Sequence, residues 1–260
     1  MEQDVIRVET DSRGVATITL NRPGRHNAMS AAMMDALAAA AARLGADPGL
    51  RAVVLTGAGE SFCAGGDLGW MMAQIQADRA QRMAEARRLA GMLRALNEMP
   101  KPLIGRIQGN AYGGGLGLIA VCDIAVAAAE VRLAFTETRL GLIPATIGPY
   151  VAARMGEGKA RRVFMSARPF DAAEAVALDL LARAVPAAEL DAAVEAELAP
   201  FLRVAPGAVG RAKALLRSLG ARIDDQVIEA TIGRLADSWE TEEARAGIAA
   251  FLDKRPPPWA

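Results

Sequence analysis

The sequence predicts an α/β fold in which helices pack on a substantially parallel sheet and a helical region follows. Two observations lead to this fold class. Up to about Pro149, short apolar, β-branched runs alternate with segments of helical periodicity, which is the pattern of layered α/β folds. Beyond that point the chain is rich in Ala, Arg and Glu, and no Pro/Gly/Ser-rich linker separates the two halves. We therefore expect one core with further helices packed on it or on a neighbouring copy.

The first elements are predicted to be a hairpin and a helix. Residues 5–9 and 15–20 alternate apolar and polar side chains, and Asp11-Ser12-Arg13-Gly14 between them favours a turn. Ser30 is a suitable N-cap for an Ala-, Met- and Leu-rich helix that ends near Gly45.

The middle of the chain is predicted to supply buried strands separated by helices. Three short apolar runs have the length of buried strands: residues 52–55, 103–107 and 124–128. Residues 67–99 are mostly helical in pattern, in two pieces, and Pro100 ends them. Gly113-Gly114-Gly115 leads into an apolar helix. Beyond Pro149, helices are predicted at residues 172–181, 187–202, 208–219, 224–239 and 242–252.

Composition excludes several classes of protein. The 260 residues carry 30 basic and 30 acidic side chains, and this balance argues against nucleic-acid and membrane-surface partners. The longest uncharged apolar run, residues 111–122, is too short to span a bilayer. Two Cys and one His cannot build a typical zinc site, so no metal is expected. The acidic start lacks a secretory signal and there is no disulfide framework, so the default location is the cytoplasm.

Two glycine-rich segments each follow an apolar strand and precede a helix. The first is residues 57–67, whose spacing fits neither a phosphate-binding P-loop nor a dinucleotide fingerprint. The second is residues 109–118, with three adjacent glycines that disfavour a helix by roughly 0.8–1 kcal/mol each. Either segment is a tight structural connection or a place where backbone N–H groups meet a ligand.

The third segment, residues 135–144, holds a carboxylate among apolar neighbours. Glu137 in such a place has a shifted pKa or a charged partner. Arg139 is the nearest partner for an ion pair, but it is two positions away and would point elsewhere in a strand. A shifted pKa of Glu137 and a structural ion pair with Arg139 therefore both stay open.

Together these segments resemble the crotonase (enoyl-CoA hydratase/isomerase) superfamily. The resemblance starts at Asn21-Arg22-Pro23-Gly24-Arg25-His26-Asn27-Ala28-Met29-Ser30 and continues through residues 62–68 and 113–115. It includes Glu137, Gly141-Leu142-Ile143-Pro144 and the end of the chain. Three stretches are most similar to bacterial methylglutaconyl-CoA hydratases of leucine and terpenoid breakdown: residues 67–71, 111–118 and 144–151.

The resemblance implies a fold and an assembly. The fold would be a crotonase-like spiral of ββα units over residues 1–195. Residues 196–260 would form a C-terminal helical oligomerisation region, and the protein would be a homotrimer or a homohexamer of paired trimers.

The resemblance also implies a catalytic apparatus. A thioester carbonyl gains negative charge as an enolate forms, and backbone N–H donors at that oxygen lower the barrier. By resemblance, the two donors are the N–H groups of Ala64 and Gly114, and Glu137 is the catalytic glutamate. The substrate is an acyl-CoA thioester, so no separate cofactor is expected. Coenzyme A would contact Arg25, Ala28, Ala64, Gly65, Gly66, Asp67, Leu68 and Gly114.

One position departs from the hydratase pattern. Standard hydratases carry a second glutamate in the glycine-helix segment, and this chain has Gly117 there. The expected activity is hydration of a 2-enoyl-CoA, with 3-methylglutaconyl-CoA as a candidate substrate. A Δ3,Δ2-enoyl-CoA isomerase with Glu137 as its single proton shuttle is the alternative, since a lone glutamate suits that reaction too. A non-catalytic acyl-CoA- or RNA-binding member is a third reading, disfavoured by zero net charge and by Glu137 itself.

Overall fold

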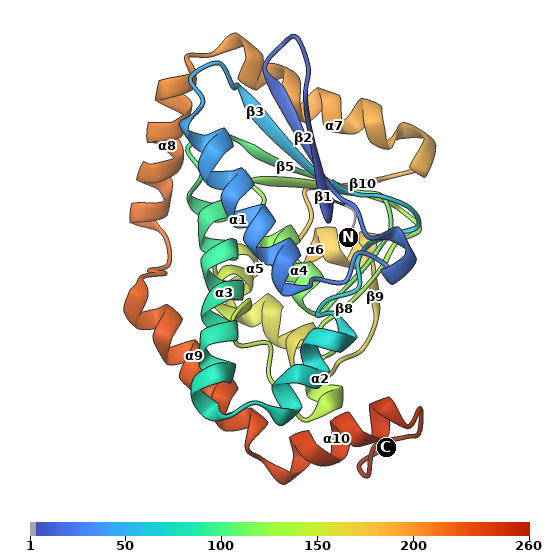
Figure 1. Ribbon diagram of the computed structural model, residues 1–260. Coiled ribbons are helices and arrows are strands. Elements are labelled where there is room, and N and C mark those ends of the chain that lie inside the picture. The colour runs from blue at the N-terminus through green and yellow to red at the C-terminus, as the bar shows by residue number, and fades with distance from the viewer. Residues whose placement is uncertain (1–3) are drawn as a thin grey trace.

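The computed structural model describes residues 4–260, and its largest sheet has six strands (Figure 1). Strand β2 pairs with β1 antiparallel, which confirms the hairpin, and all other pairs in this sheet are parallel. The strand order is β1 (Ile6–Thr10), β2 (Val15–Leu20), β3 (Ala52–Gly57), β5 (Leu103–Ile107), β7 (Ile124–Ala128) and β10 (Arg183–Val185). The predicted strands at 103–107 and 124–128 have the predicted bounds, whereas β3 extends to Gly57.

A second, smaller sheet is made of strands that the pattern of apolar runs did not predict individually. Its strands are β4 (Ser61–Cys63), β6 (Asn110–Tyr112), β8 (Arg132–Ala134) and β9 (Phe170–Asp171), in that order. Three of them, β4, β6 and β8, are parallel neighbours, and each follows a strand of the large sheet closely in sequence. The chain therefore winds as a spiral that visits both sheets on each turn, which confirms the spiral of ββα units that the resemblance implied.

The first three helices begin at side chains that cap their N-termini. Helix α1 (Ala31–Ala46) begins after Ser30, whose hydroxyl accepts a hydrogen bond from the Met33 N–H, as predicted. The predicted helical stretch divides into α2 (Leu68–Gln76) and α3 (Arg79–Glu98), capped by Asp67 and Asp78. These caps fix where α2 starts, immediately after one of the glycine-rich segments.

The remaining helices agree with the sequence prediction in part. Helix α5 was not predicted, the helix expected at 172–181 ends at Ala177, and the one expected at 187–202 is flanked by 3-10 turns. The final helix has the predicted bounds. The helices are α4 (Gly114–Ala120), α5 (Gly148–Phe164), α6 (Ala172–Ala177), α7 (Leu190–Leu198), α8 (Pro206–Leu219), α9 (Asp225–Trp239) and α10 (Glu242–Leu252).

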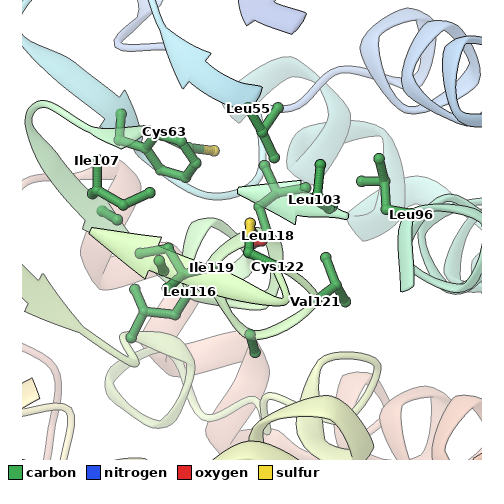
Figure 2. Close-up of a cluster of buried hydrophobic side chains, with 14 of the residues drawn as sticks. Leu55, Cys63, Leu96, Leu103, Ile107, Leu116, Leu118, Ile119, Val121 and Cys122 are labelled. Carbon is green, nitrogen blue, oxygen red and sulfur yellow. Dashed lines mark hydrogen bonds between the residues drawn. The ribbon is translucent and has the colours of Figure 1, made fainter. Parts of the chain in front are cut away.

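The main hydrophobic core lies between the large sheet and helices α1, α3 and α4. Figure 2 shows part of it, where side chains of α4 and of the residues that follow it meet β5 and β3. Leu103, Leu118 and Cys122 are fully buried there. This packing fixes α4, and with it the glycine segment at the start of α4.

The C-terminal helices differ in how closely they join this core. Leu190 and Leu198 of α7 belong to the core, so it extends slightly past the predicted boundary at residue 195, and the division into two domains stays a prediction. Helices α8, α9 and α10 then pass along α3 and beneath α2 (Figure 1). Within residues 4–260, no helix has the length and apolarity to cross a membrane.

Candidate active site

Three chain segments that sequence analysis singled out meet at one edge of the small sheet. Residues 64–67 follow β4, residues 113–115 follow β6, and Glu137 follows β8. The three strands are parallel neighbours, with Cys63 opposite Ala111 and Tyr112 opposite Ala134. Because adjacent strands lie about 4.8 Å apart and their carboxyl ends share an edge, the three segments come together.

These segments surround a cavity of about 370 Å3. Its walls are mainly apolar and include side chains from α1, α2, α3, α9 and α10. Backbone from Gly66 and Gly114 lies on the cavity surface, and so does Glu137. Among its apolar walls are Met29, Trp70, Met71, Leu142, Ile147 and Phe251. An apolar cavity with a few convergent polar groups is the usual form of a small-molecule site.

Glu137 is the titratable group of this cavity with the largest shift in pKa. It begins a 3-10 turn, Glu137–Leu140, and its Oε2 atom is buried without a hydrogen-bond partner among the described residues. Burial raises the pKa of Glu137 to about 7, although hydrogen bonds from the backbone of Glu137 and Thr136 act in the opposite direction. A carboxylate with this pKa exchanges protons near neutral pH, as a general acid–base catalyst must.

The glycine segment brings the backbone against this carboxylate. Gly113 has a positive φ of 49°, and a Cβ atom there would lie 3.1 Å from Glu137 Oε1. A Cβ atom on Gly114 would lie 2.5 Å from the terminal methyl of Met29, and one on Gly115 would lie 2.5 Å from the Cys63 carbonyl oxygen. Because these three glycines have no side chains, the backbone of the segment can lie directly against Glu137, Met29 and Cys63.

The cavity surface includes backbone N–H groups that are unused. Those of Gly66 and Gly114 have no hydrogen-bond acceptor anywhere in residues 4–260. Gly114 is the first residue of α4, and Gly66 precedes the cap of α2, so helix N-termini lie behind both donors. Unpaired donors at such positions favour negative charge.

The structure corrects the assignment of Ala64 as an oxyanion donor. The Ala64 N–H donates to the His26 carbonyl oxygen at 2.9 Å, so it is not available to a substrate. This bond exists because the chain after β4 continues in an extended form beside the turn that holds His26. Gly66, two residues later, has an unused N–H, and its place directly before the Asp67 cap is the sequence signal that could have found it.

The two segments predicted to contact coenzyme A lie side by side. Met29 and Gly66 form a parallel β-bridge, in which the Met29 N–H donates to the Gly65 carbonyl at 2.8 Å. Arg22 joins the segments further by donating to the Ala28 carbonyl and to Asp67 at 2.9 Å. Although burial alone would raise it, hydrogen bonds from Arg22 and the Trp70 N–H lower the pKa of Asp67.

The contacts of this region separate structural side chains from accessible ones. Asp67 caps α2 and pairs with Arg22, so its carboxylate serves the fold. Ala28 is buried, whereas Leu68 and Arg25 are exposed, and the Arg25 guanidinium has no partner among the described residues. His26 is exposed and its Nδ1 lies 3.1 Å from Ser61 Oγ.

Gly117 stands where standard hydratases carry a second glutamate, and the Ile147 side chain fills the space beside it. A Cβ atom on Gly117 would lie 2.4 Å from Ile147 Cγ2 and 3.0 Å from Ile147 Cβ. Ile147 is buried, so a longer side chain at position 117 requires that it move. The described part of the cavity therefore presents one carboxylate, that of Glu137.

Arg139 lies on the cavity wall and is not the ion-pair partner of Glu137. Its guanidinium donates to the Ala167 carbonyl oxygen at 3.2 Å and makes no ion pair with any residue from 4 to 260. Trp70 also lies on this wall, where its indole N–H donates to Glu85 at 2.8 Å. Sequence analysis missed this bond, since Glu85 belongs to a different helix.

The shifted pKa of Glu137 predicts the pH dependence of turnover. If the ionised form takes up a proton, kcat/KM will rise tenfold per pH unit below pH 7 and level off above it, because the pKa is about 7. An ordinary glutamate would place this limb near pH 4.5. Steady-state rates from pH 5 to 9 locate this rise of kcat/KM with pH. A midpoint near pH 4.5 would contradict the assignment of Glu137 as the group that takes up the proton.

Comparison with known proteins agrees with this geometry. The family model described as enoyl-CoA hydratase/isomerase matches residues 10–260. An enoyl-CoA hydratase from Mycobacterium avium is 31% identical with a TM-score of 0.89, over 99% of this chain and 100% of that one. One from Shewanella pealeana is 35% identical (TM-score 0.81, 99% and 97%), and Pseudomonas aeruginosa AtuE is 37% identical (0.79, 98% and 99%). The chain thus belongs to the enoyl-CoA hydratase/isomerase family and has its crotonase fold.

Proposed function

We propose that this protein hydrates a 2-enoyl-CoA. The observation that carries the proposal is the arrangement in one apolar cavity of the Glu137 carboxylate, whose Oε2 is buried without a partner among the described residues, with the unused N–H groups of Gly66 and Gly114. Two donors fit an oxygen that becomes negative, and the carboxylate fits a proton that must move nearby. Family membership supports a thioester as the molecule that brings this oxygen.

In the proposed mechanism, the thioester oxygen accepts hydrogen bonds from Gly66 and Gly114. Glu137 takes one proton from a water molecule while the water oxygen bonds to the β-carbon of the substrate. Electrons of the C=C bond move into the enolate, whose oxygen the two donors stabilise. Glu137 then returns its proton to the α-carbon, so the product gains one water and the enzyme is regenerated. Coenzyme A arrives with the substrate, and the scheme uses no separate cofactor.

The coenzyme A handle is proposed to lie along the joined segments around Arg25 and Gly66. Arg25 offers an unpaired guanidinium for a phosphate, which such a group binds well. Ala28, Ala64, Gly65 and Leu68 would contact the nucleotide and the pantetheine arm through backbone and small side chains. This places the handle outside the cavity and the acyl group within it.

A Δ3,Δ2-enoyl-CoA isomerase is the second candidate. It is favoured because the Ile147 side chain occupies the space that a second catalytic carboxylate would need. Because Ile147 packs on Gly117, one carboxylate must do all the proton transfer. In an isomerase, Glu137 would remove a proton from the α-carbon of a 3-enoyl-CoA and return it to the γ-carbon. No water enters this reaction, so a single proton shuttle suffices.

A direct assay separates the two candidates. The purified protein is given crotonyl-CoA, 3-methylglutaconyl-CoA and a 3-enoyl-CoA in parallel, and loss of the conjugated double bond or formation of the 2-enoyl product is followed. Hydration predicts loss of the absorbance of a 2-enoyl substrate and a 3-hydroxyacyl product. Turnover of the 3-enoyl-CoA alone would overturn the hydratase proposal, and turnover of none of the three would overturn both.

A finer proposal concerns the acyl group, for which 3-methylglutaconyl-CoA is the candidate. The charged side chains on the cavity wall are Glu137 and Arg139. The Arg139 guanidinium has five donors, and its one hydrogen bond goes to a carbonyl, which leaves it able to meet a substrate carboxylate. We therefore propose that the acyl chain ends in a carboxylate.

This proposal predicts a selective effect of Arg139→Gln. Hydrogen bonds to charged groups contribute about 1.5–3 kcal/mol, so kcat/KM for 3-methylglutaconyl-CoA should fall roughly 10- to 150-fold. The rate with 3-methylcrotonyl-CoA, which lacks only the carboxylate, should stay within about twofold. Arg161→Gln, on an exposed face of α5, is the control and should change neither rate.

The outcome distinguishes the possible roles of Arg139. Equal losses with both substrates would indicate a contact with coenzyme A or with the fold, and would contradict the dicarboxylic substrate. Arg139→Lys should recover part of the selective loss, because it keeps the charge without the bidentate geometry.

We also propose that the protein is a homotrimer or homohexamer in the cytoplasm. Leu215, Leu216 and Leu219 of α8 are 58–75% exposed, which is a large apolar surface for one short helix segment. Cys63 and Cys122 are free and buried, which suits a reducing compartment. Light scattering of the purified protein gives the mass, and a monomer at micromolar concentration would contradict the assembly.

A further inference from the structure

We propose that helix α10 positions the catalytic glutamate: it crosses the 3-10 turn Glu137–Leu140 at two glycines, and this contact holds Glu137 in the cavity. The inference rests on the proposed role of Glu137 as the acid–base group. It assigns a positioning function to Gly247 and to the helix that carries it, at the far end of the chain from the motifs that define the site.

The crossing is closer than any pair of side chains would allow. A Cβ atom on Gly247 would lie 2.6 Å from the carbonyl carbon of Leu140 and 2.7 Å from its oxygen. On the other side, a Cβ atom on Gly141 would lie 2.4 Å from the carbonyl carbon of Glu243. Backbone therefore packs on backbone at both points, and neither contact can be relieved by turning a side chain.

The turn and the helix are also joined by a separate hydrophobic cluster. Leu142, Trp239, Ala244 and Ile248 are each at most 7% exposed and pack together, with Leu140 partly buried against them. Figure 1 shows α10 at the bottom of the view, away from the large sheet. The turn thus has a small core of its own, provided by the C-terminal helices.

Glu137 is connected to this cluster through the backbone of the turn. The Leu142 N–H donates to the Glu137 carbonyl oxygen at 3.1 Å, and the Gly141 N–H bonds to the turn as well. Phe251, one turn beyond Gly247 on α10, contributes to the cavity wall. A shift of α10 would therefore move the glutamate and open the cavity that keeps its carboxylate away from water.

Gly247→Ala tests the inference, because the substitution does not disfavour the helical backbone conformation at this position. Gly247 lies inside a helix, where Ala is intrinsically preferred, so a harmful effect must come from the new contacts, with the Leu140 backbone and with the Trp259 ring at 2.9 Å. Gly233→Ala is the matched control: Gly233 is also helical, in α9, and a Cβ atom there would meet nothing within 4 Å.

The expected result has two parts. With Gly247→Ala, kcat should fall roughly 10- to 100-fold, since a displacement of about 1 Å suffices for such a loss. The rising limb of the pH profile should move to lower pH, because water that reaches Glu137 favours its ionised form. Gly233→Ala should leave both the rate and the limb as in the wild type.

Two results would overturn the inference. One is a folded Gly247→Ala protein with wild-type kcat and an unmoved pH limb. The other is a fall in rate with no movement of the limb, which would assign the contact to stability alone. If Gly247→Ala does not fold by circular dichroism, Ile248→Ala loosens the same cluster without a clash and must show the same shift. Failure of Glu137→Gln to impair turnover would instead remove the proposed function itself.

Discussion

Glu137→Gln should lower kcat roughly 10²- to 10⁴-fold, the usual contribution of a positioned acid–base group. The amide has nearly the same shape as the carboxylate but cannot take a proton from water or from an α-carbon. Because Oε2 has no partner among the described residues, the exchange breaks no side-chain ion pair. Binding of a substrate analogue should therefore change little, and the loss should appear in kcat rather than in KM. A variant with wild-type turnover would remove Glu137 from the mechanism.

The same substitution should stabilise the protein above neutral pH. Folding raises the pKa of Glu137 from 4.5 to about 7, so ionising the folded state is costly by about 3 kcal/mol once the pH exceeds 7. Below pH 4.5 both states are protonated and this cost disappears. Stability is thus lost as pH rises toward the folded pKa, and Gln should recover it.

Thermal unfolding of both proteins at pH 4.5 and pH 8 measures this effect. The variant should gain melting temperature relative to the wild type at pH 8 and much less at pH 4.5. A gain of equal size at both pH values would show that it does not come from the charge of Glu137.

Gly113→Ala should abolish most of the activity for a different reason. Its φ of 49° with a ψ of −121° is a conformation for glycine, and a side chain there costs about 1–3 kcal/mol of stability. The added methyl group would also lie 3.1 Å from Glu137 Oε1 and 3.3 Å from Thr136 Oγ1. Either the carboxylate or the Gly114 donor must then move, and we expect kcat to fall about 10²-fold or more.

A second positive-φ glycine provides the control. Gly156 has a φ of 69°, and a Cβ atom there would meet nothing within 4 Å. Gly156→Ala carries a similar backbone cost at a residue that does not line the cavity, so it should lower the melting temperature while leaving kcat unchanged. Equal losses of activity in the two variants would mean that destabilisation, and not the position of Glu137, limits turnover.

The sequence predicts the large sheet well because its strands are continuous apolar runs. Residues 103–107 and 124–128 are buried on both faces, so composition alone marks their ends. The small sheet was missed because its strands have three residues or fewer and are stabilised by neighbours distant in sequence. Helix α5 was missed as well: it contains two internal glycines and a kink at Gly156, which obscure its periodicity.

The candidate site shows the same limit. Motif order identifies the three segments, and Glu137 and Gly114 lie in the cavity as the resemblance implies. Which N–H of residues 64–66 is free depends on the bond from Ala64 to the His26 carbonyl, and nothing in the local sequence reports that bond. The contact of α10 with the Glu137 turn depends on a crossing of segments about a hundred residues apart, so it needs the folded chain.

The small sheet also has a consequence for how the protein folds. Its strands are collected from successive turns of the spiral, so the catalytic groups meet only after several long loops have closed. The entropy cost of closing these loops comes before the distant parallel pairings can contribute stabilising contacts. Chains of this topology fold slowly for that reason. During synthesis, a ribosome-bound chain that has reached α4 already contains both donor segments but not the acid–base residue. The catalytic site therefore forms late, when the whole spiral has folded, and no single segment contains all of its groups.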